Sequence, residues 1–201
     1  MNFDQEYHTK VAQPYAKQSF WRQENMAVIS QVITEAHLGR CLDVGCDDGS
    51  FAEMLRVCAD TDIAHGVDVN EFAVQKGALL YPKVFLQHYY GSYLPYACDV
   101  FDVVTCVNSL GHMLYPFLAL QEMFRVLKSG GVLGLHLPNL TYYDDIGDHN
   151  GDPTQRNCWT MQATIAKVKK AGFQIDSVEG MGRCYPNTGS RARITLKGRK
   201  P

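Results

Sequence analysis

The sequence lacks a strong net charge and a long apolar run. The chain of 201 residues carries 19 Lys and Arg against 21 Asp and Glu, a formal net charge of −2. It therefore lacks the basic field that non-specific nucleic-acid binding needs. No apolar run reaches transmembrane length, and residues 1–10 lack the hydrophobic region of a signal peptide. We expect a cytoplasmic protein that binds neither nucleic acid nor membranes.

A disulfide framework is also missing. The seven cysteines are odd in number and irregularly spaced, unlike the paired cysteines of a small secreted fold. Cys41 and Cys106 lie inside apparent strands, where a free thiol behaves as a small apolar group. This usage is typical of a reducing compartment and agrees with a cytoplasmic location.

The glycine pattern of dinucleotide-binding proteins is absent as well. That pattern, G-x-G-x-x-G, lets the backbone approach a pyrophosphate. Here the spacing is Gly45-x-x-x-Gly49 with no third glycine, and Asp47 and Asp48 place two carboxylates in the turn. A nicotinamide-dependent oxidoreductase is therefore disfavoured. A cofactor with an amino acid end and no phosphate fits better.

What is present is an alternation of strand and helix patterns. The length suits one domain with one sizeable core. Helical apolar spacing occurs at 22–37, after Gly49, at 117–127 and at 161–168, and strand-like runs occur at 41–44, 63–67, 84–87, 101–107 and 131–137. This alternation predicts an α/β sandwich with a mostly parallel sheet. Two further strands, 173–178 and 191–197, follow without a helix between them and predict an antiparallel hairpin, the second strand being half-exposed. The basic residues Lys197, Arg199 and Lys200 are expected to form a solvated tail.

The most informative segment runs from Cys41 to Phe51. It has the pattern of a short strand, a glycine turn and a helix, with Ser50 and Glu53 as a candidate capping box. Asp68 ends the next apolar run. Such a corner brings backbone N–H groups and the positive end of a helix to a ligand. An acid at the tip of the next strand can accept hydrogen bonds from two ribose hydroxyls. The pattern predicts a nucleoside cofactor at the carboxyl edge of the sheet.

The segment resembles the first motif of class I S-adenosylmethionine-dependent methyltransferases, acidic-x-Gly-x-Gly-x-Gly. Asp43, Gly45 and Gly49 match, while Asp47 stands at the middle glycine. Asp tolerates left-handed backbone angles, so the turn can survive this departure. Other segments match in order: 94–96, 101–107, 109–112, 121–131 and the strand end 136–139, which is similar to small-molecule methyltransferases of the ubiquinone-biosynthesis type. The resemblance covers roughly residues 38–197. It implies a Rossmann-like three-layer sandwich with a seven-stranded sheet ending in an antiparallel hairpin.

The resemblance implies S-adenosylmethionine as cofactor and S-adenosylhomocysteine as product. The residues expected to contact the cofactor are Asp43, Gly45, Cys46, Gly49, Asp68, Val69, Tyr90, Gly91, Val107, Asn108 and Tyr15. Three of these have alternatives. Asp43 could be a strand-end residue that bonds its own turn. Asp68 could cap the helix from Glu71, although Asn70 could fill that role. Tyr90 stands where the family usually has an acid against the adenine, and it could equally pack the loop. His112 is the candidate catalytic base, or it caps or packs the next segment.

A single domain is expected over 1–201, with a helical lid or cap over 1–37 and a catalytic core over 38–201. Segment 144–152 is acidic, but its register fails as an EF-hand, so no metal is predicted. Candidate lid residues are Tyr7, Tyr15, Phe20 and Trp21, and candidate substrate-wall residues are Tyr142, Tyr143, His149 and Trp159. The expected function is methyl transfer from S-adenosylmethionine to an oxygen or nitrogen of a small molecule. The alternative is a non-catalytic, cofactor-binding subunit that serves a partner protein. A homodimer is left open.

Overall fold

The computed structural model describes residues 19–37, 39–142, 156–184 and 191–201. Its strands are β1 (Cys41–Val44), β2 (Ala64–Asp68), β3 (Val84–His88), β4 (Phe101–Val107), β5 (Leu127–Pro138), β6 (Gln174–Cys184) and β7 (Arg191–Arg199). Its helices are α3 (Ser19–Ala36), α4 (Ser50–Ala59), α5 (Glu71–Leu80), α6 (Pro116–Val126), α8 (Met161–Lys170) and the 3-10 turn η2 (Leu110–His112). Among the described helices, none is long and apolar enough to cross a membrane.

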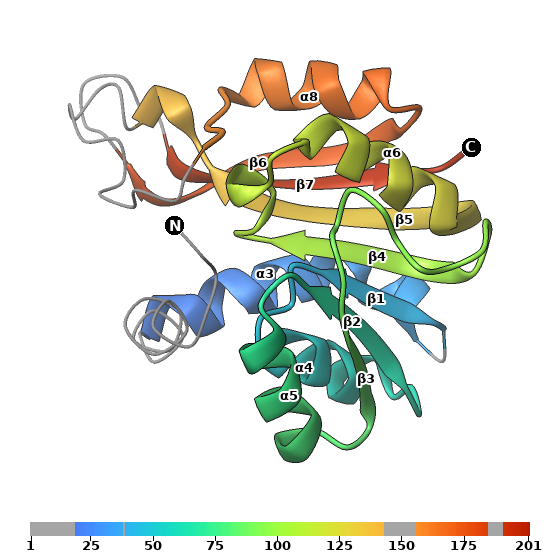
Figure 1. Ribbon diagram of the computed structural model, residues 1–201. Coiled ribbons are helices and arrows are strands. Elements are labelled where there is room, and N and C mark those ends of the chain that lie inside the picture. The colour runs from blue at the N-terminus through green and yellow to red at the C-terminus, as the bar shows by residue number, and fades with distance from the viewer. Residues whose placement is uncertain (1–18, 38, 143–155, 185–190) are drawn as a thin grey trace.

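The strands form one seven-stranded sheet in the order β3-β2-β1-β4-β5-β7-β6 (Figure 1). β1 to β5 pair in parallel, whereas β7 pairs antiparallel with both β5 and β6. The expected parallel sheet with a terminal antiparallel hairpin is confirmed. Strand order reverses between β1 and β4, and ligands of open α/β sheets bind at the carboxyl ends of the strands at such a point.

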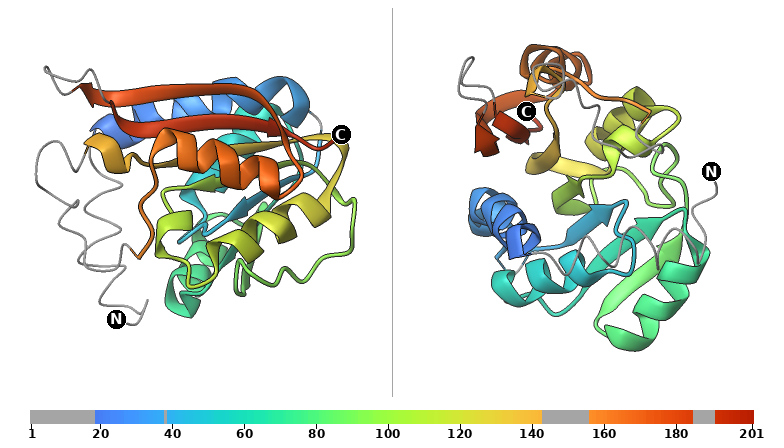
Figure 2. Two further views of the ribbon diagram at one scale, coloured as in Figure 1. Left: turned by 90° about the horizontal axis from the view of Figure 1, so that it is seen from above. Right: turned by 90° about the vertical axis from the view of Figure 1, so that its left-hand side faces the viewer.

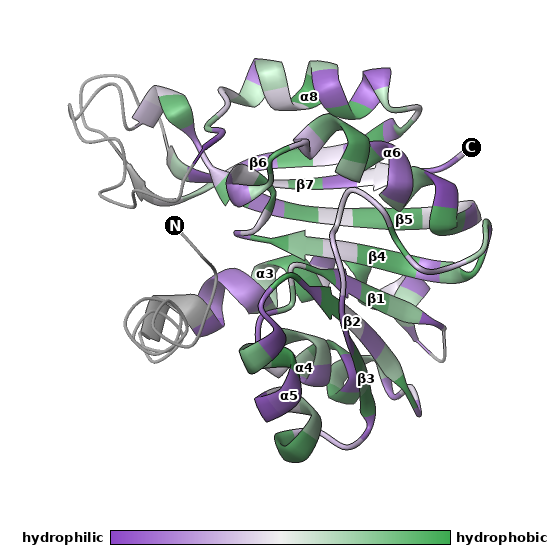
Figure 3. Ribbon diagram, viewed as in Figure 1, coloured by the Kyte–Doolittle hydropathy of each residue, from purple (hydrophilic) through white to green (hydrophobic). Residues whose placement is uncertain are grey.

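Two helical layers cover the sheet (Figure 2). α3 and α4 pack on one face with Val28, Ile29 and Leu55, and α6 and α8 pack on the other with Leu120 and Val168. Central strands β4 and β5 are mostly apolar and buried along most of their length (Figure 3), as expected for parallel strands covered on both sides. α3 thus belongs to the sheet-covering layer. The expected lid spans residues 1–37 and so includes α3. The part of it before α3, residues 1–18, lies outside the described residues.

The Gly130–Gly131 pair lies inside a strand. The sequence pattern places the strand-like run at 131–137, but β5 begins at Leu127. The β4–β5 register shifts between Phe101 and Val103, and Gly130 has a φ of 80°. The backbone N–H of Gly130 donates to the carbonyl of Lys200 at 2.8 Å. The glycines therefore form an irregularity in the strand, held by the end of the chain.

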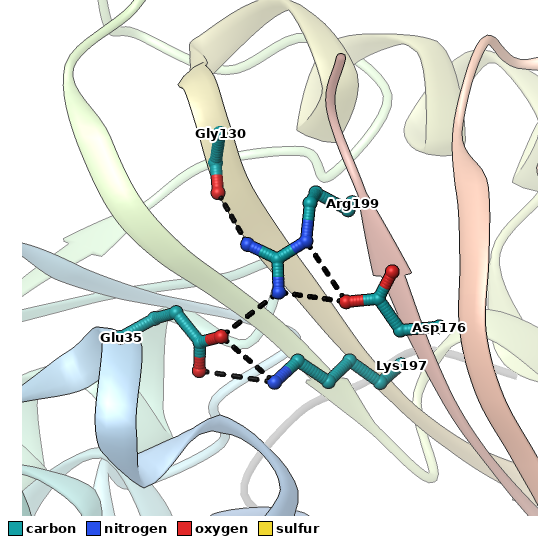
Figure 4. A network of polar contacts seen from close by, with 5 residues as sticks. All are labelled: Glu35, Gly130, Asp176, Lys197 and Arg199. Atoms are coloured by element: carbon teal, nitrogen blue, oxygen red, sulfur yellow. Dashed lines mark hydrogen bonds and ion pairs between the residues drawn. The ribbon is translucent and has the colours of Figure 1, made fainter.

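The polar face of β7 is buried at Arg193 and Thr195 and half-buried at Lys197 and Arg199, so the prediction of a half-exposed strand is wrong there. Arg193 and Thr195 are 8% and 0% exposed because α3 covers them. The solvated basic tail is also wrong, since its cations are paired (Figure 4). Lys197 and Arg199 each donate to Glu35 of α3 at 2.9 Å, and Arg199 also pairs with Asp176 at 2.7 Å. These contacts fasten the last strand to the first described helix.

The expected capping box of α4 does not form. Gly49 is the N-cap residue, in a left-handed conformation and without a side-chain cap. The N–H of Ser50 donates to Asp48 Oδ1 at 3.1 Å. Glu53 instead accepts from Arg56 Nε at 2.6 Å. The helix start is thus set by the glycine turn and by Asp48.

Candidate functional site

Three alternate residues of the turn after β1 have left-handed backbone angles. Gly45, Asp47 and Gly49 have φ values of 80°, 48° and 78°, so Asp47 adopts the conformation that the motif's middle glycine would have. A Cβ on Gly45 would overlap the side chain of Ser109, and one on Gly49 would lie 2.8 Å from Leu86 Cδ2. Both glycines are therefore needed for close packing as well as for backbone angle.

Asp68 closes this turn from the end of β2. Its Oδ2 accepts from the N–H of Asp47 at 2.9 Å, and its Oδ1 accepts from the N–H of Asn70 at 2.7 Å. Asn70, rather than Asp68, caps α5, because its side chain accepts from the N–H of Ala73. A carboxylate has about four lone-pair sites, and the backbone N–H groups of Asp47, Asn70 and Val69 bond to that of Asp68. Val69, half-buried, follows directly.

Asp43 lies beneath the turn in β1 and is 2% exposed. Thr105 of β4 donates its hydroxyl to Asp43 Oδ1 at 2.8 Å. Burial raises the pKa of Asp43 to about 7, although the Thr105 hydrogen bond opposes this, and the charge of Asp68 adds to the rise. Burial likewise raises the pKa of Asp68 to about 6, against the backbone hydrogen bonds from Asn70 and Asp47.

Three carboxyl groups, those of Asp43, Asp47 and Asp68, thus influence one another at one corner. The raised pKa values of Asp43 and Asp68 mean that the free protein holds their negative charge at a cost. A ligand that brings positive charge and hydroxyl donors would relieve it, whereas a pyrophosphate would add to it. These carboxylate acceptors fit S-adenosylmethionine, whose sulfonium and amino groups are positive and whose ribose hydroxyls donate hydrogen bonds. They do not fit the pyrophosphate of a dinucleotide.

The end of β4 joins the same corner. The hydroxyl of Ser109 contacts the carbonyls of Gly45 at 2.7 Å and Val107 at 2.9 Å. Asn108 has a left-handed φ of 54°, and its N–H donates to the carbonyl of His136 at 2.7 Å. Val107 and Asn108 therefore lie at the carboxyl edge, beside the glycine turn.

The segment after β3 also reaches this edge. The N–H of Tyr89 donates to the carbonyl of Asp68 at 2.8 Å. A Cβ on Gly91 would lie 2.9 Å from both Val44 Cγ1 and Met113 Cε, so Gly91 lies against the end of β1. The Tyr90 side chain is 63% exposed. Gly91 is placed in the site region by its packing, while Tyr90 lies on the surface beside it.

Two further candidates have structural contacts. Cys46 is buried, and a Cβ on Gly66 of β2 would lie 2.8 Å from its Sγ. Burial holds the pKa of its thiol well above the ordinary value, so the side chain is an apolar packing group. His112 is half-buried at the end of η2, and its backbone N–H donates to the carbonyl of Ser109 at 3.0 Å.

Several candidates fall outside the described residues: Tyr7, Tyr15, Tyr143, His149 and segment 144–152, together with the side chains of Phe20 and Trp21. Of the expected substrate wall, Tyr142 is buried and Trp159 packs against the core with Lys167 Nζ 4.9 Å from its ring. Trp159 therefore has a packing role in the described structure.

The sequence analysis missed Thr105 and Ser109 as residues that shape the site. Thr105 is the one hydroxyl residue within the strand sequence FDVVTCV, which is a signal for a polar partner. The contact of Ser109 with Gly45 joins positions 64 residues apart, and no local pattern indicates it.

Known proteins resemble this chain as follows. A family model described as a methyltransferase domain matches residues 4–178. A protein named as a probable S-adenosylmethionine-dependent methyltransferase of Mycolicibacterium smegmatis is 26% identical over 83% of this chain and 64% of its own length. The chain spans less than two thirds of the length of several such relatives. A ubiquinone biosynthesis O-methyltransferase of Histophilus somni is 23% identical over 70% of both chains.

A solved structure shares the fold. It is a chain in the complex between the Haloferax volcanii Trm112 methyltransferase activator and a methyltransferase. The match covers 97% of this chain and 96% of that one, with a TM-score of 0.81 and 14% sequence identity. This likeness concerns the fold alone.

Proposed function

Because the chain belongs to the S-adenosylmethionine-dependent methyltransferase family, we propose that it transfers the cofactor's methyl group to an oxygen or nitrogen of a small molecule. The observation that carries the proposal is the corner formed by the left-handed turn 45–49, Asp43 below it and Asp68 across it. The corner offers hydrogen-bond acceptors and negative charge to a cationic nucleoside. The ubiquinone biosynthesis relative supports a small-molecule acceptor.

In this proposal Asp68 accepts hydrogen bonds from the ribose hydroxyls. Gly45, Cys46 and Gly49 present backbone groups to the methionine end, and Asp43 orients that end through the turn. Val69, Tyr90 and Gly91 surround the adenine, and Val107 and Asn108 form the floor. Bound S-adenosylmethionine supplies an electrophilic methyl group. The protein supplies alignment, which contributes on the order of 7–11 kcal/mol in well-oriented reactions. His112 is the proposed base for an acceptor that must lose a proton.

A second candidate is a cofactor-binding subunit that works with a partner protein. The solved methyltransferase of the same fold is seen with an activator protein, and Asp47 departs from the glycine of the motif. Incubation with methyl-labelled S-adenosylmethionine and a panel of small hydroxyl and amine acceptors separates the two. Label transfer by the isolated chain supports the enzyme. Tight cofactor binding without transfer to any acceptor favours the subunit.

Replacement of Asp47 by glycine is expected to tighten S-adenosylhomocysteine binding or leave it level. The left-handed φ of 48° costs a non-glycine residue on the order of 1 kcal/mol. The substitution also removes a carboxylate near the expected place of the methionine carboxylate. Calorimetric titration checks this. A loss greater than about tenfold, or 1.4 kcal/mol, would identify Asp47 as a ligand and the turn as different from the family's.

Removal of residues 1–18 is expected to lower turnover by about 10- to 100-fold, the scale of lost positioning. Cofactor affinity should fall far less than turnover, because the corner is built from later residues and Tyr15 is the one expected cofactor contact that the cut removes. The cut spares α3, which packs on the sheet. Circular dichroism first verifies that the truncated chain folds, and turnover and S-adenosylhomocysteine titration follow. Equal loss of both would place these residues in the cofactor site or the core rather than in a lid.

A further inference from the structure

The contact between α3 and β5 changes from apolar to polar toward the carboxyl end of β5. A Cβ on Gly134 would lie 3.0 Å from Val32 Cγ1 and 3.2 Å from Val28 Cγ1, so the helix lies close on the strand. One helical turn before Val28 stands Glu24, and two residues after Gly134 stands His136. Glu24 Oε2 lies 3.6 Å from His136 Nε2. At the carboxyl end of β5, the otherwise apolar contact with α3 is therefore made by a carboxylate and an imidazole.

β7 completes this cluster. Arg193 Nε donates to Glu24 Oε1 at 3.4 Å, and His136 Nδ1 lies 2.8 Å from Thr195 Oγ1. The side chains of Glu24 and Arg193 are 9% and 10% exposed, and His136 is fully buried. A buried carboxylate is tolerated only when it is paired and hydrogen-bonded. Arg193 supplies that pairing, while His136 Nε2 lies 3.6 Å from the carboxylate and has no hydrogen-bond partner among the described residues.

Asn25 stands beside the cluster on the sheet-facing side of α3. It is 0% exposed, and neither of its amide atoms has a hydrogen-bond partner in the described part of the chain. Ile29 lies one helical turn later and belongs to a buried apolar cluster. Val107 of β4 packs against the same cluster. A buried polar group without a partner costs about 1–3 kcal/mol and is rare in native structures. Such a group is explained when a ligand supplies its partner.

The cluster lies on the acceptor side of the proposed cofactor site. His136 pairs in register with Val107, and its carbonyl accepts from the N–H of Asn108. In the strand order, β4 separates His136 of β5 from Asp68 of β2, which lies beyond β1 on the opposite side. If the cofactor occupies the corner between Asp68 and Val107, the Glu24 cluster borders the part of the carboxyl edge that the cofactor leaves for a second molecule.

We infer that Glu24 and Asn25 bind a hydroxyl group of the methyl acceptor, with His136 and Arg193 as positioning residues. Glu24 can accept the hydroxyl proton, and the Asn25 amide can donate to the hydroxyl oxygen. A hydroxyl is a small neutral group that can donate to Glu24 and accept from the Asn25 amide nitrogen at the same time. The inference rests on the proposed function and narrows its acceptor to a neutral, hydroxyl-bearing molecule.

Thermal melting tests the unpartnered amide without any acceptor. Asn25→Leu removes the buried amide at similar volume, and it should raise the melting temperature by about 2–8 °C if the amide is left unpaired in the free protein. Asn70→Leu is the matched control. Asn70 is also buried but caps α5, so its replacement should lower the melting temperature. A fall with Asn25→Leu similar to that of the control would overturn the inference.

Binding of phenol and benzyl alcohol, with toluene as the control lacking a hydroxyl, tests the ligand chemistry. Each is titrated into protein saturated with S-adenosylhomocysteine while the Asn25 side-chain amide signal is followed by NMR. Phenol or benzyl alcohol should shift that signal and toluene should not. In calorimetric titrations with the same probes, Glu24→Gln and Asn25→Leu should each weaken binding of the hydroxyl probe about tenfold, the scale of one hydrogen bond to a charged or buried group.

The cofactor affinity of both variants should stay within about threefold of the unaltered protein, or less than 1 kcal/mol. No shift with either hydroxyl probe, or equal probe affinity in all three proteins, overturns the inference. A failure of the unaltered protein to bind S-adenosylhomocysteine is a different outcome. It contradicts the proposed function, whereas the melting comparison still decides whether the Asn25 amide is unpaired.

Discussion

Replacement of Asp68 by alanine is expected to weaken S-adenosylhomocysteine binding by about 100-fold. Two hydrogen bonds from ribose hydroxyls to a carboxylate are worth about 1.5–3 kcal/mol each, and about 2.7 kcal/mol is already a factor of 100. The carboxylate also accepts from the N–H groups of Asp47 and Asn70. Its loss therefore loosens the turn as well as removing the ligand's acceptor.

Asp48→Ala is the matched control for Asp68→Ala. Asp48 lies on the same turn, but its carboxylate accepts from the N–H of Ser50 at the start of α4, so its removal should change affinity by less than about threefold. Binding to the unaltered protein should also weaken as pH falls below about 6, the pKa of Asp68, because the protonated acid is a poorer acceptor. Unchanged affinity in Asp68→Ala would contradict the ribose assignment.

Replacement of Asp43 by asparagine is expected to stabilise the protein at pH 8 while weakening cofactor binding. Burial raises the pKa of Asp43 to about 7, above an unfolded value of about 3.9. The folded form therefore binds this proton more tightly, so stability present at low pH is lost as pH rises from about 4 through 7. The full loss in the free energy of unfolding is roughly 4 kcal/mol. An asparagine whose side-chain oxygen still accepts from Thr105 should recover about 1–4 kcal/mol of it.

Denaturant unfolding of Asp43→Asn at several pH values checks this sign. The gain should be largest at pH 8, shrink below pH 7 and vanish near pH 4. Asp102→Asn is the opposite control. Its carboxylate is partly buried, which raises its pKa, but hydrogen bonds from Lys128 and the Arg40 N–H bring the pKa below the ordinary value. That substitution should destabilise the protein at pH 8. A loss of stability in both variants would contradict the buried-charge account of Asp43.

Local patterns predict most of the fold because the elements are bounded by strong signals. β1 and β4 are short apolar runs, and α4 follows a glycine turn, so their positions agree with the sequence to within one or two residues. The burial of β7 could not be predicted in this way. Arg193 and Lys197 alternate with apolar residues as in an exposed strand, and only the long-range pairing with Glu24 and Glu35 of α3 buries that face.

The candidate site also combines features that local sequence predicts with features that depend on long-range contacts. The left-handed turn and Asp68 follow from a motif confined to a few residues and are found where expected. Thr105 below Asp43 and Ser109 against Gly45 depend on the pairing of β1 with β4 and the chain that follows it. Asn25 is a single polar residue on the apolar face of a helix, and such a residue is ordinary in sequence. Its burial without a hydrogen-bond partner among the described residues becomes visible only when α3 is placed on the sheet.

Calorimetric titration of the unaltered protein with S-adenosylhomocysteine, S-adenosylmethionine and NAD at pH 7.5 tests the central claim most directly. The carboxylate-rich corner predicts one site per chain with micromolar or tighter affinity for the two sulfur nucleosides, about −8 kcal/mol or better, and no measurable binding of NAD. Absence of binding by both sulfur nucleosides, or displacement of either by NAD, would contradict the account.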